Sequence, residues 1–250
     1  MSEQRKAPPK QLRWHQAIAD VRPHIVKIST PQGSGTGFEC AMSQSGTLMG
    51  IATAAHVIDH AHYWQEPIRI DHHDSGSSVL LHQDDRAIIF DEPQDTAFII
   101  IPRSTLKELP ETTPLLHEED SHLRLGVGVG WLGFPAISPN DLCFFSGNIS
   151  CRQGGSARYL IDGVAINGVS GGPVIHTPSE GGFRIIGIIS AYIPNRTTGI
   201  SMPGLCVAQD VSRLHESIKQ FATLTAAKTA ESEQAIVPPD VQKAEPEKQG

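Results

Sequence analysis

Short runs of alternating apolar and polar residues recur through most of this chain and predict β-strands. Two of the runs are separated by the polar turn 43–46 and are typical of a hairpin. Many short strands bounded by turn residues indicate an all-β barrel or sandwich. In the first half of the chain, the expected strands cover residues 24–29, 38–42, 48–53, 79–81, 86–90 and 97–101.

The second half repeats the pattern after a proline-containing connector at residues 102–122. Its strands are expected near residues 123–129, 141–151, 159–162, 173–176, 183–189 and 205–208. One helix is predicted at residues 210–221, because Val211, Leu214, Ile218 and Phe221 fall on one face. A shorter helix is expected at residues 12–21.

The two ends of the chain differ in composition from its centre. Residues 1–12 are polar, and residues 223–250 are rich in Ala, Glu, Lys, Pro and Gln with almost no large apolar side chains. Such segments cannot bury enough apolar surface to offset the entropy lost on ordering. We therefore expect disorder at both ends.

Charge and composition argue against several classes of partner. The net charge is −7 with both signs dispersed, whereas a nucleic-acid-binding protein needs a clustered basic patch. Residues 1–10 lack the apolar run of a secretory signal, and no run is long enough to span a bilayer. We expect a cytoplasmic protein with no nucleic-acid or membrane partner.

Neither the cysteines nor the histidines predict a metal site. The four cysteines are irregularly spaced, without a Cys-x-x-Cys pair, and are expected to be reduced, with a Cys143–Cys151 disulfide across a hairpin as the weaker alternative. Histidines gather at residues 60–73 in a stretch that we interpret as a loop. Their spacing lacks a helical i, i+4 pair with a supporting carboxylate, so we expect structural or solvated histidines, no metal and no cofactor.

The candidate chemistry centres on residues 167–173, Asn-Gly-Val-Ser-Gly-Gly-Pro. Two glycines after a serine suit a sharp turn that leaves backbone N–H groups directed into a cavity. In such a turn, Ser170 can attack a carbonyl, and the N–H groups of Gly168 and Ser170 can converge on the resulting oxyanion. A glycine-rich hairpin turn with a surface serine is the alternative.

A serine nucleophile needs a base, and the base needs a group that fixes its tautomer. His56 ends the apolar run 50–55, and Asp95 opens the apolar run 96–101. The order His, Asp, Ser along the chain excludes hydrolases with the two other known orders. Other carboxylates lie nearby, and Asp84, Asp85 and Asp91 stay open as alternatives to Asp95.

Three segments together resemble the signatures of trypsin-like (chymotrypsin-fold) serine peptidases: Thr-Ala-Ala-His-Val at 53–57, Asp-Thr-Ala at 95–97 and Gly-Val-Ser-Gly-Gly-Pro at 168–173. Residues 33–38 and 130–135 resemble strands of the bacterial Deg/HtrA-type branch, here without a PDZ domain. The likeness covers about residues 20–222.

The resemblance implies an all-β fold of two antiparallel six-stranded β-barrels with a C-terminal helix and a disordered tail. It divides the chain into an N-terminal segment (1–20), a peptidase domain (21–222) and a tail (223–250). Within the domain, it implies a first barrel at about 21–105, a second at about 122–209 and a helix at 210–222.

The resemblance also implies a serine endopeptidase with His56, Asp95 and Ser170 as the triad. It places the base of the P1 pocket near Val164 and the pocket wall at Ser190, Ala191 and Tyr192. Because no aspartate stands at the base, we expect small or medium apolar P1 residues in a protein or peptide substrate. A catalytically silent or partner-activated peptide-binding module, or an esterase, is the alternative.

Overall fold

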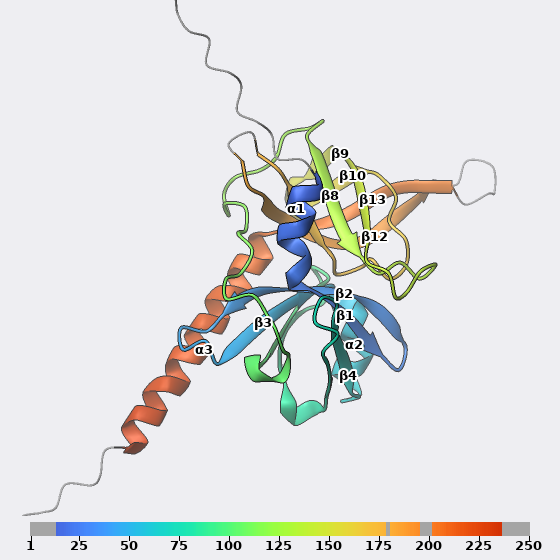
Figure 1. Cartoon of the computed structure of the whole chain (residues 1–250). Helices are drawn as coiled ribbons and strands as arrows, with labels where there is room; N and C mark the ends of the chain where they lie inside the picture. The colour runs from blue at the N-terminus through green and yellow to red at the C-terminus, as the bar shows by residue number, and fades with distance from the viewer. Residues whose placement is uncertain (1–13, 179–180, 196–201, 237–250) are drawn as a thin grey trace, which may run out of the picture.

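The computed structural model describes residues 14–178, 181–195 and 202–236. Figure 1 shows two β-rich units, one coloured blue to green and the other yellow-green to orange, with helix α1 (Trp14–Val21) beside their junction. The short helix expected at 12–21 is therefore present. Residues 1–13 and 237–250 lie outside the described residues, so their predicted disorder stays a prediction.

The first unit is a sheet of seven antiparallel strands rather than the six expected. Its strand order is β5-β4-β1-β2-β3-β7-β6. The strand missed from sequence is β4, which lies in the histidine-containing stretch that we interpreted as a loop. Its Ile68 and Ile70 alternate with polar residues and are fully buried, which is the period-two pattern of a strand. The strands are β1 (Ile25–Thr30), β2 (Gly33–Met42), β3 (Leu48–Thr53), β4 (Ile68–His72), β5 (Ser78–Leu81), β6 (Ala87–Asp91) and β7 (Thr96–Pro102).

The second unit is a closed six-stranded barrel, as expected. Its strand order is β10-β13-β12-β11-β8-β9. Cys143 and Cys151 both lie on β9, so they cannot face each other across a hairpin, and all four cysteines are free. The strands are β8 (Gly128–Gly133), β9 (Cys143–Gln153), β10 (Arg158–Asp162), β11 (Pro173–His176), β12 (Arg184–Asn195) and β13 (Met202–Asp210).

An apolar cluster joins the two units. It contains buried side chains of both, among them Phe98 of β7 and Ile188 of β12, together with Val21 of α1. Burying such side chains contributes about 1.5–3 kcal/mol each, so the junction is a core rather than a flexible hinge. The units are held as the two halves of one cleft.

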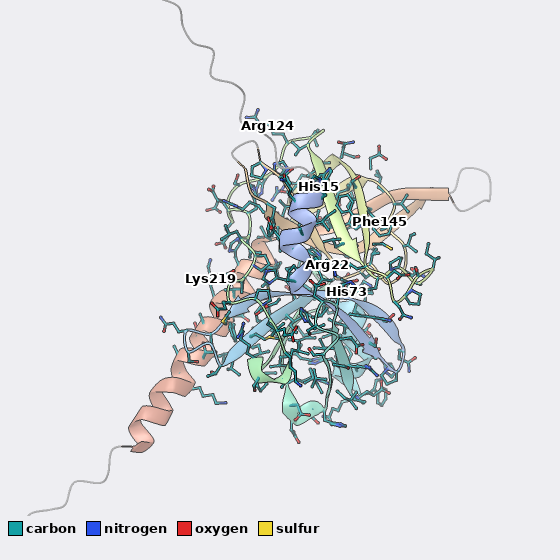
Figure 2. The ribbon with its side chains drawn as sticks, in the orientation of Figure 1. His15, Arg22, His73, Arg124, Phe145 and Lys219 are labelled. Atoms are coloured by element: carbon teal, nitrogen blue, oxygen red, sulfur yellow. The ribbon has the colours of Figure 1, made fainter. Side chains whose placement is uncertain are left out.

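Polar and aromatic contacts add to this junction. Figure 2 labels Arg22 and His73 near the end of α1 where the units meet. The ring of His73 lies 5.5 Å from that of Phe134, which follows β8 of the second unit, and Arg22 Nε lies 2.6 Å from Asp74 Oδ1. Phe134 is thereby anchored to the first unit, beside the candidate site.

The C-terminal helix α3 (Ser212–Ile236) packs on the first unit and continues away from it (Figure 1). Phe221 contacts Phe98, and Lys219 Nζ lies 2.7 Å from Glu119 of the connector. Our prediction that residues 223–236 belong to a disordered tail was wrong. This stretch is poor in large apolar residues but rich in strong helix formers such as alanine, which favour continuation of an established helix.

None of the helices in the described part of the chain is long and apolar enough to cross a membrane.

Candidate active site

The loop between β10 and β11 carries Ser170, and two glycines dictate its shape. Gly168 has φ +95° and lies so close to Phe134 that an added Cβ would stand 2.2 Å from its carbonyl oxygen. Gly171 has φ +85°, and its added Cβ would stand 2.0 Å from the carbonyl oxygen of Thr36. No L-residue with a side chain fits either position without displacing backbone. The loop is therefore a packed structure and not a free hairpin turn.

The carbonyl of Asn167 shows how this loop is oriented. Its oxygen accepts a hydrogen bond of 2.6 Å from the N–H of Ala136. In a trans peptide, the C=O and the following N–H point in opposite directions, so the N–H of Gly168 is directed away from Ala136. Within the described residues, the N–H groups of Gly168 and Ser170 donate no backbone hydrogen bond. Both residues line a cavity of about 210 Å³ and leave two amide donors for a ligand.

His56 comes from the first unit, at the start of α2 (Ala55–Tyr63), and pairs with Asp95 in the turn between β6 and β7. Its Nδ1 lies 2.9 Å from both carboxylate oxygens of Asp95, and its backbone N–H donates to Oδ1 at 2.9 Å. Asp95 has φ +49°, a left-handed conformation that aspartate tolerates better than most residues. The imidazole is therefore oriented by the carboxylate, with Nε2 left for another partner.

Ser190 takes part in a contact that sequence reasoning missed. We expected it only in the wall of a substrate pocket, but its hydroxyl also donates to Asp95 Oδ2. It lies buried on β12, so a residue of the second unit holds the carboxylate of the first. No local pattern signals this pairing, because the two residues are far apart along the chain.

Ser170 and His56 lie at the same cleft, since both line the cavity of about 210 Å³ and a second cavity of about 270 Å³. The hydroxyl of Ser170 donates to the carbonyl oxygen of Ser190 at 3.4 Å. This is a long hydrogen bond, and rotation about one side-chain bond redirects the hydroxyl. The sequence-predicted His56, Asp95 and Ser170 are thus brought to one place.

The second cavity is a small pocket beside Ser170, and His56 is the one ionisable residue among the described residues that line it. Val164, which we expected at its base, is 45% exposed and does not line it. The preceding Gly163 packs against the ring of Trp131, and the next side chain is left facing solvent. Ala191 lines the pocket as expected, whereas the side chain of Tyr192 lies outside the described structure. The lining residues are His56, Ala165, Ile166, Asn167, Val169, Ser170, Ile189, Ser190 and Ala191.

The electrostatic surroundings of His56 favour its protonated form. The hydrogen bond to Asp95 raises the pKa of His56, burial opposes this, and the charges of Asp95 and Asp59 raise it further. A carboxylate that stabilises an imidazolium in this way supports an imidazole that accepts a proton. Elsewhere in the described residues, no group of three or more His, Cys, Asp or Glu side chains could hold a metal ion.

Comparison with solved structures identifies the architecture. No family model matches the chain, and no curated protein matches its sequence. The chain is similar to the serine endoprotease from Yersinia pestis (TM-score 0.61, 18% identity, 85% of this chain and 67% of that chain). It is also similar to Rv3671c from M. tuberculosis H37Rv in the inactive form of a serine-to-alanine mutant (TM-score 0.55, 17% identity, 82% of this chain and 89% of that chain). The chain therefore has the trypsin-like serine protease fold, formed here by a seven-stranded sheet, a closed six-stranded barrel and a C-terminal helix.

Proposed function

We propose that this protein is a serine endopeptidase that cleaves peptide bonds through an acyl-enzyme intermediate. The observation that carries the proposal is the His56–Asp95 hydrogen bond at a cleft shared with Ser170 and its glycine-rich loop. The structural neighbour from Yersinia pestis, which bears the name serine endoprotease, supports the same reaction class. Because one fold can host different chemistries, the proposal rests mainly on the geometry of the site.

Each group of the site has a defined task in the reaction. The Oγ of Ser170 forms a bond to the substrate carbonyl carbon while His56 Nε2 accepts the hydroxyl proton. His56 then passes this proton to the leaving amine as the C–N bond breaks. Water repeats the sequence on the acyl-enzyme and releases the acid. Asp95 holds Nδ1–H and stabilises the imidazolium in both steps.

The loop at residues 167–170 stabilises the negative charge that develops on the carbonyl oxygen of the tetrahedral intermediate. The N–H groups of Gly168 and Ser170 donate to the oxyanion, and losing one such donor typically costs about 3 kcal/mol of transition-state stabilisation. The hydrogen bond from Ala136 to the Asn167 carbonyl supports a loop that is formed before substrate arrives. No cofactor enters this scheme.

The pocket and the neighbouring strand indicate how a substrate is selected. A pocket of about 270 Å³ with no charged lining residue other than the catalytic histidine suits a small or medium apolar P1 side chain. β11 pairs with β12 only up to Ile188, whereas β13 pairs with β12 as far as Asn195. Within the described residues, no strand pairs with the other edge of β12 beyond Ile189, so an extended peptide can add there as a strand.

A peptide library tests both the activity and the preference. Wild-type protein should cleave after Ala, Val or similar residues far faster than after Arg or Lys, because a cation would be buried in this pocket without a partner. Cleavage should stop after treatment with a fluorophosphonate. A profile dominated by Arg or Lys would contradict the pocket assignment, and an absence of both cleavage and labelling would favour a peptide-binding module.

The pH profile should respond to Asp59, whose charge helps to raise the pKa of His56. Hydrolysis needs neutral His56, so kcat/KM falls as pH drops through this pKa. In Asp59→Asn, the pKa of His56 should be lower than in the wild type, so the acidic limb of the kcat/KM profile should move to lower pH. The measurement is kcat/KM across the pH range, with Glu66→Gln, the partner of His60, as the control. An unmoved limb would refute the assigned coupling.

A further inference from the structure

Thr36 on β2 makes four hydrogen bonds at the point where the two units meet. Its N–H donates to the carbonyl oxygen of Ser170 at 2.8 Å, and its Oγ1 donates to the carbonyl oxygen of Gly168 at 2.8 Å. The same Oγ1 accepts the N–H of Phe134 at 3.1 Å, and its carbonyl accepts the hydroxyl of Thr53 at 2.7 Å. Thr36 is fully buried, so water does not compete for these groups.

The hydroxyl of Thr36 acts on the residue that carries the oxyanion donor. The carbonyl of Gly168 belongs to the peptide that follows the Asn167–Gly168 peptide, whose N–H is directed away from Ala136. With this carbonyl bound to Thr36 and that of Asn167 bound to Ala136, the peptide planes on both sides of the Gly168 Cα are fixed. The Gly168 N–H lies in the first of these planes, and the second plane restrains the rotation at Gly168 that would let the first one turn.

Close packing leaves the hydroxyl one orientation. An added Cβ at Gly133 would stand 2.9 Å from Thr36 Oγ1 and 2.8 Å from the Cα of Val169, so backbone of the second unit packs closely around this group. Its single proton is given to Gly168, and an acceptor site is taken by Phe134. Removing the hydroxyl would leave a buried carbonyl and a buried N–H without partners, each of which is costly.

We propose that Thr36 is a positioning residue for the oxyanion hole, an inference that rests on the proposed peptidase function. Its hydroxyl transmits the position of β2, a strand of the unit that carries His56, to the loop that carries Ser170. Thr36 touches neither substrate nor the reacting atoms and acts through the peptide at Gly168. It should affect the chemical step far more than substrate binding.

Two substitutions separate the hydroxyl from the shape of the side chain. Thr36→Val keeps the shape and loses the hydroxyl, and kcat should fall at least about tenfold with KM within about twofold. Thr36→Ser keeps the hydroxyl, and kcat should stay within about threefold of wild type. If the valine variant does not fold, Thr36→Ala is compared with Thr36→Ser instead. Equal kcat in the variants with and without the hydroxyl would overturn the proposal.

Ser43→Ala is the matched control, because Ser43 also accepts a backbone N–H in a partly buried position, from Leu48 at 3.0 Å. Ser43 directly follows the end of β2, about 20 Å from Thr36 in the strand direction, and its replacement should leave kcat unchanged. Hydrogen exchange provides a readout that does not need catalysis: exchange at residues 163–172 should rise in Thr36→Val and not in Thr36→Ser or Ser43→Ala. An inactive wild type would refute the peptidase function alone, and unchanged exchange would refute the role of Thr36.

Discussion

Replacing Ser170 with alanine should lower kcat/KM for peptide hydrolysis by about 10⁴- to 10⁶-fold. The change removes the only atom of the cleft that forms a bond to the substrate in the proposed scheme. It leaves the pocket and both amide donors in place, because alanine keeps the backbone and the loop is shaped by Gly168 and Gly171. KM should therefore change much less than kcat.

Steady-state kinetics with a peptide identified from the library measure this loss, and covalent labelling by a fluorophosphonate gives a second readout. Labelling should disappear in Ser170→Ala and persist in the control Ser45→Ala, an exposed serine in the β2–β3 turn. A Ser170→Ala protein that still hydrolyses the peptide at the parent rate would rule out Ser170 as the nucleophile.

The three residues of the proposed triad could be located from sequence because each sits in a short segment with its own pattern. His56 follows a buried strand, Asp95 precedes another, and Ser170 lies between glycines that only a tight turn requires. Such features depend on neighbours along the chain. The same holds for the closed second barrel, whose strands are marked by local alternation and turns.

The contacts that complete the site depend on residues remote in sequence. Ser190 reaches Asp95, and Thr36 reaches Gly168, only because the two units share an apolar core. A serine in a strand and a threonine beside glycines are ordinary residues in sequence. Their roles arise from the way two sheets face each other, which no local period encodes.

Smaller errors have equally specific causes. Val164 and Ala165 are adjacent, and which one enters the pocket depends on how the chain leaves Gly163 beside Trp131. In the stretch around β4, we gave the histidines more weight than the alternation of Ile68 and Ile70, although His72 is itself buried, with Nε2 2.8 Å from the Pro23 carbonyl oxygen. Side-chain polarity alone was a poor guide there, because buried histidine is tolerated when hydrogen-bonded.

Each unit supplies part of the candidate site, which explains why the cleft lies at their junction. The first unit supplies His56 and Asp95, and the second supplies Ser170 and its loop. The hydroxyl of Ser190, in the second unit, bonds to Asp95 of the first. The hydroxyl of Thr36, in the first unit, bonds to Gly168 of the second. Loosening the junction should therefore disturb the proposed base and the proposed oxyanion donors together.

Replacing Asp95 with asparagine should lower kcat by about 10⁴-fold while leaving the fold intact. The carboxylate accepts hydrogen bonds from the His56 backbone, from its Nδ1–H and from Ser190, whereas an amide presents one oxygen and one NH₂ group. An NH₂ group facing Nδ1 favours the tautomer with its proton on Nε2, which cannot accept the proton of Ser170. Asparagine also tolerates the left-handed backbone that this position requires, so the loss is chemical.

Asp91→Asn is the control, and it also tests one of the three carboxylates that the sequence left open as alternatives to Asp95. Asp91 accepts the N–H of Gln94 at 3.2 Å in the same turn but makes no hydrogen bond to His56 within the described structure, so its variant should keep kcat within about twofold. The ring nitrogen resonances of His56 report the tautomer directly and should change in Asp95→Asn alone. If Asp95→Asn retains kcat, or if Asp91→Asn loses it instead, Asp95 is not the group that orients the base.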